Sequence, residues 1–347
     1  MCVPLKRTEA IIVGGGIAGW SLAYRLYQHN VSFCLFDSGQ NHSTSVAAGL
    51  INPLVFKRLT KSWKVDEFLP EARVFYSELE KITRSSFFEP VEYYKIIPDV
   101  EWINNWESKR HDENFADYIG EITKIRIGGK TFDAGLVKNV FQLHTPLFLN
   151  ALERFFKDSI IKEPFDYKQL ELTGEGFCYK NIRAEKIIFA EGYQVIHNPF
   201  FKQIPMVPTK GEVLTVANNR QITTSVNKDF FILPGKDTLT IGATYHWHNV
   251  SLEPEKEGIE ELTQKYLDFI GEPPEIISAR AGIRPAMKDR RPVLGAHPEI
   301  KNMFIFNGLG TKGCMTAPLL SLTLFRRIFE QKPLPKETDV LRFLKKL

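Results

Sequence analysis

The sequence predicts a mixed α/β fold, in which an α/β domain is interleaved with an antiparallel β-rich domain. Three observations lead to this prediction. A strand, a glycine turn, a helix and a second strand follow one another over residues 9–37. Strands of alternating apolar and polar residues dominate residues 203–278. Near the end of the chain, an apolar strand over 303–307 again leads through a glycine turn into a helix.

The length of the chain supports a division into two domains. The chain has 347 residues, whereas a single hydrophobic core stops growing beyond about 250–300 residues. We expect a Rossmann-like nucleotide-binding domain made of residues 1–85, 140–202 and 279–347. Residues 86–139 and 203–278 are expected to form the substrate-binding domain.

The first glycine turn has the spacing of a dinucleotide-binding site. Gly14 permits a tight turn, Gly16 lets a pyrophosphate approach the backbone, and Gly19 lets the next helix pack closely on the sheet. The N-terminus of that helix offers free N–H groups to phosphates. Asp37 ends the second strand, about 20 residues further on, where a carboxylate binds ribose hydroxyls. The alternative is a glycine-rich turn without nucleotide, but the order of strand, turn, helix, strand and acid favours the nucleotide site.

The remaining elements follow from hydrophobic periodicity. Apolar residues at helical spacing predict helices over residues 66–82, 146–156, 257–270 and 315–330. Short strands and an aromatic-rich helix are expected between 86 and 135. Further strands are predicted near 166–172 and over 186–190, 211–216, 230–233 and 239–244. The run at 186–190 is apolar throughout, which is typical of a buried parallel strand.

Composition and charge are those of an ordinary globular protein. Hydrophobic residues make up 43% of the chain and charged residues 25%. The net charge of +4 neither supports nor excludes a polyanionic partner. The four cysteines form no CxxC pair, which favours a reducing compartment. The first strand begins too close to Met1 for a signal peptide, and no apolar run reaches the ~18–20 residues of a membrane span. We therefore expect a cytoplasmic protein.

The sequence shows no metal or nucleophile site. No Ser/His/Asp or Cys/His set stands out. His246 and His248 could share one face of a strand, but no third ligand accompanies them, so no metal is predicted.

Several motifs, in order along nearly the whole chain, resemble those of the D-amino-acid-oxidase superfamily of FAD-dependent oxidoreductases. The pattern is similar to the glycine-oxidase and sarcosine-oxidase branch and to the flavin domain of the enzyme that makes methylaminomethyl-uridine in tRNA. Besides the first turn, the resemblance rests on residues 47–49, 188–192, 208–212, 242–244, 281–285, 292–295 and 307–313. The resemblance implies FAD as the cofactor. It implies non-covalent binding, because the cysteine that sarcosine oxidases use for covalent attachment is missing here.

The resemblance also implies which residues hold the cofactor. The phosphates are expected at the first turn, the adenosine ribose at Asp37 and the flavin along residues 43–50. Tyr167 falls where the family contacts the adenine, although a buried strand aromatic is an equally good reading. The full set is Gly14, Gly15, Gly16, Ile17, Ala18, Gly19, Asp37, Ser38, Ser43, Thr44, Ala48, Gly49, Leu50, Tyr167, Gly192, Gly308, Gly310, Thr311, Lys312 and Gly313.

The second glycine turn, over 308–313, supports a flavin independently. A flavin gains negative charge at its pyrimidine edge when it accepts a hydride, and a helix N-terminus beside that edge stabilises this charge. Lys312 could add a full positive charge. A plain loop is the alternative for the turn, and a solvent-facing lysine is as good a reading of Lys312 as a flavin neighbour.

The substrate residues come from the resemblance as well. In amino-acid oxidases of this family, the arginine of a Gly-x-Arg-Pro segment clamps the substrate carboxylate, and here that residue is Arg284. A salt bridge from Arg284 to Asp289 is the alternative. Phe231 replaces a tyrosine that glycine oxidase uses to hold the carboxylate, and Tyr245 could restore the hydroxyl. We therefore expect Arg284, Tyr245, Phe231 and Lys312 around the substrate.

The implied function is an FAD-dependent oxidoreductase that removes a hydride from the α-carbon of a small amino acid or secondary amine and gives an imine that hydrolyses. Oxygen or another acceptor would re-oxidise the flavin. Two alternatives are an oxidase that removes a carboxymethyl group from the wobble uridine of tRNA, and a non-catalytic flavoprotein subunit. The sequence leaves the identity of the amine open.

Overall fold

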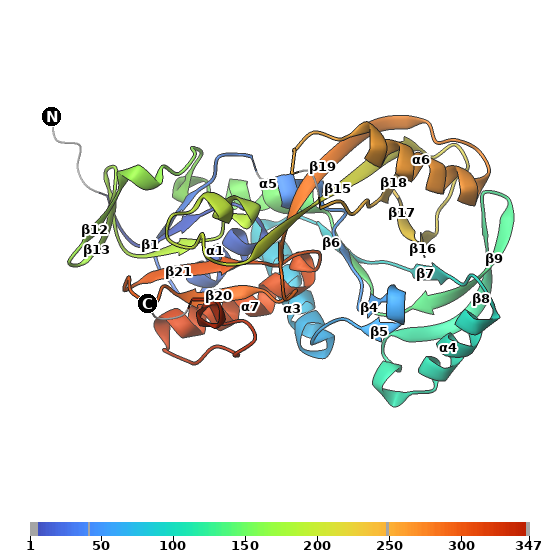
Figure 1. Ribbon diagram of the computed structural model, residues 1–347, viewed down its shortest axis with the longest axis horizontal. Coiled ribbons are helices and arrows are strands. Elements are labelled where there is room, and N and C mark those ends of the chain that lie inside the picture. Colours follow the sequence, from blue (N-terminus) through green and yellow to red (C-terminus); the bar gives the residue numbers. More distant parts are fainter. Residues whose placement is uncertain (1–5, 41, 248–249, 345–347) are drawn as a thin grey trace.

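The computed structural model describes residues 6–40, 42–247 and 250–344. It confirms the predicted mixed α/β fold. Two eight-stranded sheets lie in opposite halves of an elongated molecule (Figure 1). Helices α1, α3, α5 and α7 lie beside the first sheet, whereas α4 and α6 lie beside the second.

The first sheet is assembled from distant segments of the chain. Its order is β11-β2-β1-β14-β13-β12, with β21 beside β14 and β20 beside β21. Strands β11, β2, β1, β14 and β21 pair in parallel. The bounds are β1 Lys6–Val13, β2 Phe33–Phe36, β11 Ile160–Ile161, β12 Leu170–Thr173, β13 Gly176–Tyr179, β14 Ile182–Phe189, β20 Val293–Ala296 and β21 Met303–Asn307.

Both faces of the first sheet are buried. Along β1, Ala10 and Ile12 point into a core shared with the helices. Ile11 and Val13 point to the opposite face, into a core formed with β13, β14 and β21. Successive side chains of a strand alternate between faces, so an apolar strand of this kind must be covered on both sides.

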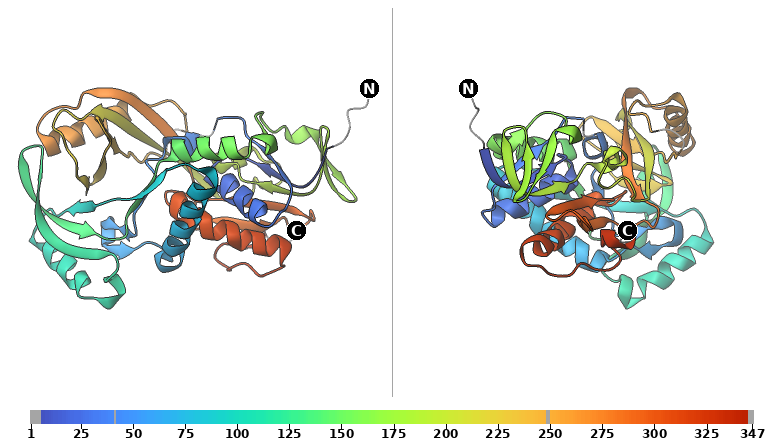
Figure 2. Two further views of the ribbon diagram at one scale, coloured as in Figure 1. Left: turned by 180° about the vertical axis from the view of Figure 1, so that it is seen from behind. Right: turned by 60° about the vertical axis from the view of Figure 1, so that its left-hand side comes forward.

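The helices of the first half have the bounds α1 Ile17–Gln28, α2 His42–Val46, α3 Val65–Thr83, α5 Thr145–Phe155 and α7 Gly313–Phe329. Helices α1 and α7 lie side by side (Figure 2). Arg25 of α1 donates to the carbonyl of Pro318 in α7 at 3.1 Å, and Tyr76 of α3 donates to the carbonyl of Cys314 at 2.6 Å. These bonds fix where the start of α7 lies relative to α1 and α3.

The second sheet has the order β19-β15-β18-β17-β16-β7-β9-β8. All neighbouring strands are antiparallel except β16 and β7. The bounds are β7 Tyr93–Ile96, β8 Ile119–Ile127, β9 Lys130–Val137, β15 Met206–Ala217, β16 Ser225–Lys228, β17 Phe230–Pro234, β18 Thr238–Gly242 and β19 Ile276–Met287, with helices α4 Val100–Arg110 and α6 Lys256–Ile270. Five short strands form two further sheets, β3-β10-β6 and β4-β5, with the bounds β3 Leu50–Ile51, β4 Leu54–Val55, β5 Thr60–Lys61, β6 Phe88–Pro90 and β10 Phe141–Leu143.

Most predicted elements are confirmed within a few residues, but two differ. The predicted strand near 166–172 begins with a 3₁₀ turn over Tyr167–Gln169, and only Leu170–Thr173 is extended. Residues 276–287 form the long strand β19, which the periodicity did not indicate because Gly282, Arg284 and Pro285 interrupt the apolar pattern. This strand crosses the predicted domain boundary at 278/279. The domain division itself stays a prediction.

Among the described helices, none combines the length and the apolar character that a membrane crossing needs.

Gly19 illustrates how tightly α1 packs on the first glycine turn. A Cβ at Gly19 would lie 1.9 Å from the carbonyl oxygen of Gly14 and 3.4 Å from Ile12. The atom that it would meet is backbone, which cannot retreat without moving the turn itself. This confirms the close packing that the spacing predicts for Gly19.

We predict that Gly19→Ala destabilises the protein by roughly 1–3 kcal/mol, as overpacked cores do. The better helix propensity of alanine, about 1 kcal/mol, is too small to offset the clash. Thermal and urea unfolding of the variant measure the effect. Gly174→Ala is the matched control, because a Cβ there would have no neighbouring atom within 4 Å. Equal stability of the two variants would contradict the prediction.

Candidate functional site

A cavity of about 650 Å³ lies where the carboxyl edge of the first sheet meets the second sheet. The structure brings nearly all of the predicted site residues to its wall. The lining includes Gly14, Gly15, Gly16, Ile17, Ala18, Asp37, Ser38, Ser43, Thr44, Ala48, Gly49, Leu50, Tyr167, Gly192, Phe231, Tyr245, Arg284, Gly310, Thr311, Lys312 and Gly313. Gly19 and Gly308 are not among the lining residues.

The first turn presents an open helix N-terminus to the cavity. Gly14 has φ +108°, a left-handed conformation that favours glycine, and a Cβ there would lie 2.4 Å from the carbonyl oxygen of Ala190. Gly16 is the N-cap of α1 and gives no side-chain cap, and the first turn of the helix carries no acidic residue. One of its amides, that of Ile17, donates to the Thr44 hydroxyl at 3.1 Å. Without an acidic residue in this turn, the N-terminus keeps most of its positive partial charge for an anion.

Asp37 lies against this turn. A Cβ at Gly15 would meet the Asp37 carboxylate at 2.4 Å, and that carboxylate accepts a hydrogen bond from the Gly39 amide at 3.2 Å. Burial raises the pKa of Asp37, and the Gly39 amide partly opposes this. The carboxylate is thus oriented at the end of β2, as the sequence predicts.

The second turn delivers another open helix N-terminus to the same cavity. Helix α7 begins at Gly313, and its N-cap Lys312 gives no side-chain cap. Gly308 and Gly310 adopt the left-handed φ values of +73° and +56°. A Cβ at Gly308 would lie 2.6 Å from Met287, so both the conformation and the close packing favour glycine at this point of the turn.

Lys312 turns inward at the start of α7. Its ammonium donates to the carbonyl of Asn52 at 2.7 Å, and desolvation lowers its pKa to about 8. No carboxylate of the described residues lies within ion-pair distance of it. The structure therefore does not support the reading of Lys312 as a solvent-facing lysine.

Arg284 extends from β19 beside Gly211 of β15. Its guanidinium donates from Nη1 to the carbonyl of Lys210 at 3.1 Å, and from Nη1 and Nη2 to the carbonyl of Thr244 at 3.3 Å each. A Cβ at Gly211 would meet Nη2 at 2.1 Å. Burial lowers the pKa of Arg284, and the nearby Tyr245 and Glu212 partly oppose this.

The alternative pairing of Arg284 with Asp289 is not present. Asp289 instead forms an ion pair with Arg342 at 2.9 Å. Arg284 is held by neutral backbone carbonyls, and within the described part of the chain it has no carboxylate partner. Its positive charge is therefore left facing the cavity.

Aromatic rings surround the arginine. Phe231 lines the cavity, and the guanidinium carbon of Arg284 lies 5.4 Å from the centre of the Tyr245 ring. The Tyr245 ring, which is 44% exposed, packs edge-on against Trp247 with centroids 5.0 Å apart. Tyr93 and Asn227 also line the cavity. The sequence reasoning missed these two residues because nothing in their local pattern separates them from ordinary strand residues.

Glu191 is a further acid that the sequence did not single out as a site residue. Its carboxylate accepts hydrogen bonds from the Tyr167 hydroxyl and, at 2.8 Å, from the side-chain amide of Asn198. Burial raises the pKa of Glu191 to about 7, although these two donors lower it in part. Tyr167 lines the cavity from a 3₁₀ turn, so it is not the buried strand aromatic of the alternative reading. An acid directly after an apolar parallel strand is the signal that could have identified Glu191.

A comparison with protein families decides which kind of protein has this site. The family model described as FAD dependent oxidoreductase, DAO, matches residues 9–326. The chain belongs to this family. It is thus an FAD-dependent oxidoreductase, as the motifs predict.

Individual relatives agree with the family. The chain is 26% identical over 350 residues to glycine oxidase from Bacillus subtilis (strain 168), covering 90% of each protein. It is 24% identical over 315 residues to the tRNA 5-methylaminomethyl-2-thiouridine biosynthesis bifunctional protein of Campylobacter jejuni (strain RM1221), covering 85% of this chain and 47% of that protein. The crystal structure of glycine oxidase from Geobacillus kaustophilus has the same fold, with a TM-score of 0.78 at 20% identity over 99% of this chain and 100% of that one.

The residues of the cavity fit the cofactor of the DAO family. Two helix N-termini face one cavity, and neither has an acidic residue in its first turn or a side-chain cap from its own N-cap residue. One suits the two phosphates of FAD, and the other, with Lys312, suits the edge of a flavin that gains negative charge. The individual contacts to FAD stay predictions.

A metal centre finds no support in the described residues, which contain no group of three or more His, Cys, Asp or Glu side chains placed to hold an ion. His246 is bonded to Glu261 at 3.1 Å. His248 lies outside the described residues.

We predict a pH-dependent stability that stems from Glu191. Folding raises its pKa from 4.5 to about 7, so the folded chain binds this proton more tightly than the unfolded chain. The resulting stability is fully present below about pH 4.5 and is lost as the pH rises through about 7. In the FAD-free protein, Glu191→Gln should remove this decline, as measured by urea unfolding between pH 5 and 8. Parallel pH profiles for both proteins would contradict the prediction.

Proposed function

We propose that this member of the DAO family oxidises a small amino acid or secondary amine that carries a carboxylate next to the reacting carbon. The observation that carries the proposal is Arg284. Its guanidinium lines the cavity, is fixed by the carbonyls of Lys210 and Thr244, and keeps its charge free of any carboxylate in the described chain. A planar guanidinium binds a carboxylate through two parallel hydrogen bonds, which fixes both position and orientation.

The proposed reaction needs positioning more than acid–base groups. When bound, FAD accepts the hydride that leaves the α-carbon. The substrate nitrogen loses a proton to solvent, so an imine forms, and one water then hydrolyses it to an oxo-acid and an amine. Arg284 holds the carboxylate, while Phe231 and Tyr93 exclude water from the reacting end of the cavity. Lys312 supplies positive charge beside the second turn.

Non-covalent binding of the cofactor is part of the proposal. Cys314 lines the cavity at the start of α7. Burial raises the pKa of its thiol to about 12, so at neutral pH it is not a thiolate nucleophile. Denaturation should therefore release FAD into the filtrate. We also infer a cytoplasmic location from the reducing environment that the unpaired cysteines favour.

The test is anaerobic mixing of the yellow protein with glycine, sarcosine, proline and D-alanine, with methylamine as the control that lacks a carboxylate. Loss of the visible flavin absorbance with one of the amino acids, and not with methylamine, is the expected result. Admission of air then shows whether oxygen re-oxidises the cofactor. Absence of bleaching with every amine would favour a non-catalytic flavoprotein and overturn the proposal.

A tRNA substrate is the second candidate, favoured by the match to the Campylobacter jejuni protein over 85% of this chain. Arg284 would then hold the carboxymethyl group of a modified uridine. Because phosphate contacts dominate the affinity of proteins for nucleic acids, a gel shift with tRNA at low salt separates this candidate from a free amino acid.

We predict that Gly211→Ala weakens substrate binding without unfolding the protein. The new Cβ would overlap Nη2 of Arg284, and the end of a long side chain can move aside. Displacing the guanidinium should raise KM for the carboxylate substrate on the order of tenfold or more, while stability changes by less than about 1 kcal/mol. Gly174→Ala is again the control. An unchanged KM would show that Arg284 does not bind the substrate carboxylate.

A further inference from the structure

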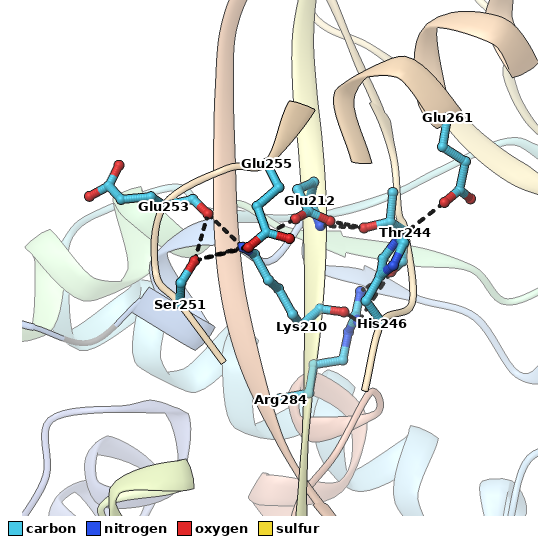
Figure 3. Close-up of polar contacts among 9 residues, drawn as sticks. All are labelled: Lys210, Glu212, Thr244, His246, Ser251, Glu253, Glu255, Glu261 and Arg284. Atoms are coloured by element: carbon cyan, nitrogen blue, oxygen red, sulfur yellow. Dashed lines mark hydrogen bonds and ion pairs between the residues drawn. The ribbon is translucent and has the colours of Figure 1, made fainter. Parts of the chain in front are cut away.

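A buried charge cluster lies behind Arg284, on the other face of the strand that supports it. Lys210 and Glu212 are 0% and 1% exposed, and they flank Gly211 on β15 (Figure 3). Because side chains alternate along a strand, Lys210 and Glu212 point away from the face where Arg284 passes Gly211. The start of α6 covers them, since a Cβ at Gly258 would lie 2.6 Å from the Glu212 carboxyl.

Lys210 is surrounded by oxygen atoms. Its ammonium lies 3.5 Å from the Glu212 carboxylate and 3.1 Å from that of Glu255. It also donates to the Ser251 hydroxyl at 2.9 Å and to the Glu253 carbonyl at 2.6 Å. A fully buried ammonium is costly unless it is paired and hydrogen-bonded, and here all of its donors are used.

Glu212 in turn holds Thr244. The Thr244 hydroxyl donates to the Glu212 carboxylate and accepts from the Glu212 amide at 2.8 Å. The Thr244 amide also donates to the Glu212 carbonyl at 3.3 Å. These three bonds fix both the side chain and the backbone of Thr244.

The carbonyls of the same two residues, Lys210 and Thr244, accept the hydrogen bonds of Arg284. The Lys210 carbonyl also accepts from the His246 amide at 3.0 Å, so its direction is fixed. The side chains of the cluster thus hold the two peptide groups on which the guanidinium rests (Figure 3). No charged side chain of the cluster touches the guanidinium itself.

We propose that Lys210, Glu212 and Thr244 are positioning residues for Arg284. We also propose that Lys210, which pairs with both Glu212 and the partly exposed Glu255, offsets the buried charge of Glu212, so that Arg284 keeps its attraction for a substrate carboxylate. The inference rests on the carboxylate-binding role of Arg284 proposed above. Without Lys210, a buried carboxylate close to Arg284 would compete with the substrate for its charge. A lysine that only braced residues 251–255 would have no such effect.

The test is a double-mutant cycle on Lys210 and Glu212 in the FAD-loaded protein. Binding of acetate, a carboxylate that cannot be oxidised, is measured by calorimetry for the wild type, Lys210→Met, Glu212→Gln and the double variant. Acetamide is the neutral probe of the same shape. Lys210→Met should weaken acetate binding on the order of tenfold, because an unbalanced carboxylate acts strongly on a nearby cation at low dielectric, and should leave acetamide binding nearly unchanged. The double variant should recover most of the lost affinity.

Two results would overturn the inference. One is equal weakening of acetate and acetamide by Lys210→Met, and the other is a double variant as weak as Lys210→Met alone. Should the lysine variants fail to fold, Thr244→Val and Thr244→Ser carry the test. Valine keeps the shape but loses the hydroxyl and should weaken acetate binding, whereas serine should retain it; equal affinity in these two variants also overturns the inference.

Arg284→Ala separates this inference from the proposed function. If this variant binds acetate as the wild type does, the carboxylate role of Arg284 fails, and the positioning role fails with it. If Arg284→Ala loses acetate binding, but the double variant Lys210→Met/Glu212→Gln binds acetate as weakly as Lys210→Met alone, only the positioning role fails.

Discussion

The parallel pairing of β1 with β14, and of β14 with β21, is the constraint on which the site depends. Parallel strands end at the same edge of a sheet, so three segments far apart in the sequence deliver their following turns to one place. The first glycine turn follows β1, Gly192 follows β14, and the second glycine turn follows β21. The Asn307 side chain donates to the Gly192 carbonyl at 2.8 Å and ties the last two together.

The second sheet brings Arg284 to the cavity. Strand β19 pairs with β15 along nearly its whole length, in a register that sets Arg284 opposite Thr209. The Gly310 amide donates to the Pro285 carbonyl at 3.1 Å, which joins the second glycine turn to the residue after the arginine. The arginine and the second helix N-terminus are thereby held at a fixed distance, although they come from different sheets. The proposed role of Arg284 requires such a fixed relation, because hydride transfer depends on the placement of substrate against cofactor.

The sequence was informative where the backbone itself is constrained. Glycine is favoured where φ is positive or where a Cβ would collide. The positions of Gly14 and Gly308 in the sequence therefore predict the two turns. Strand β19 could not be predicted in this way, because it is held by its long pairing with β15 and not marked by an apolar pattern of its own. The segment 208–212 is one of the motifs of the family resemblance, but the burial of Lys210 and Glu212 could not be predicted, because both residues are typical of a solvated strand. The start of α6 covers Glu212, and Ser251, Glu253 and Glu255 of the preceding segment enclose Lys210.

The acidic and the basic side chains of the cavity lie in different parts of it. The acids Asp37 and Glu191 lie beside the first turn: a Cβ at Gly15 would touch Asp37, and one at Gly14 would lie 3.1 Å from the Glu191 backbone. The cations Lys312 and Arg284 lie beside the second turn and the second sheet. Both cations bond to neutral carbonyls and to no carboxylate of the described chain. A carbonyl directs a cation without cancelling its charge, so this arrangement gives orientation while the attraction for an anionic ligand is kept.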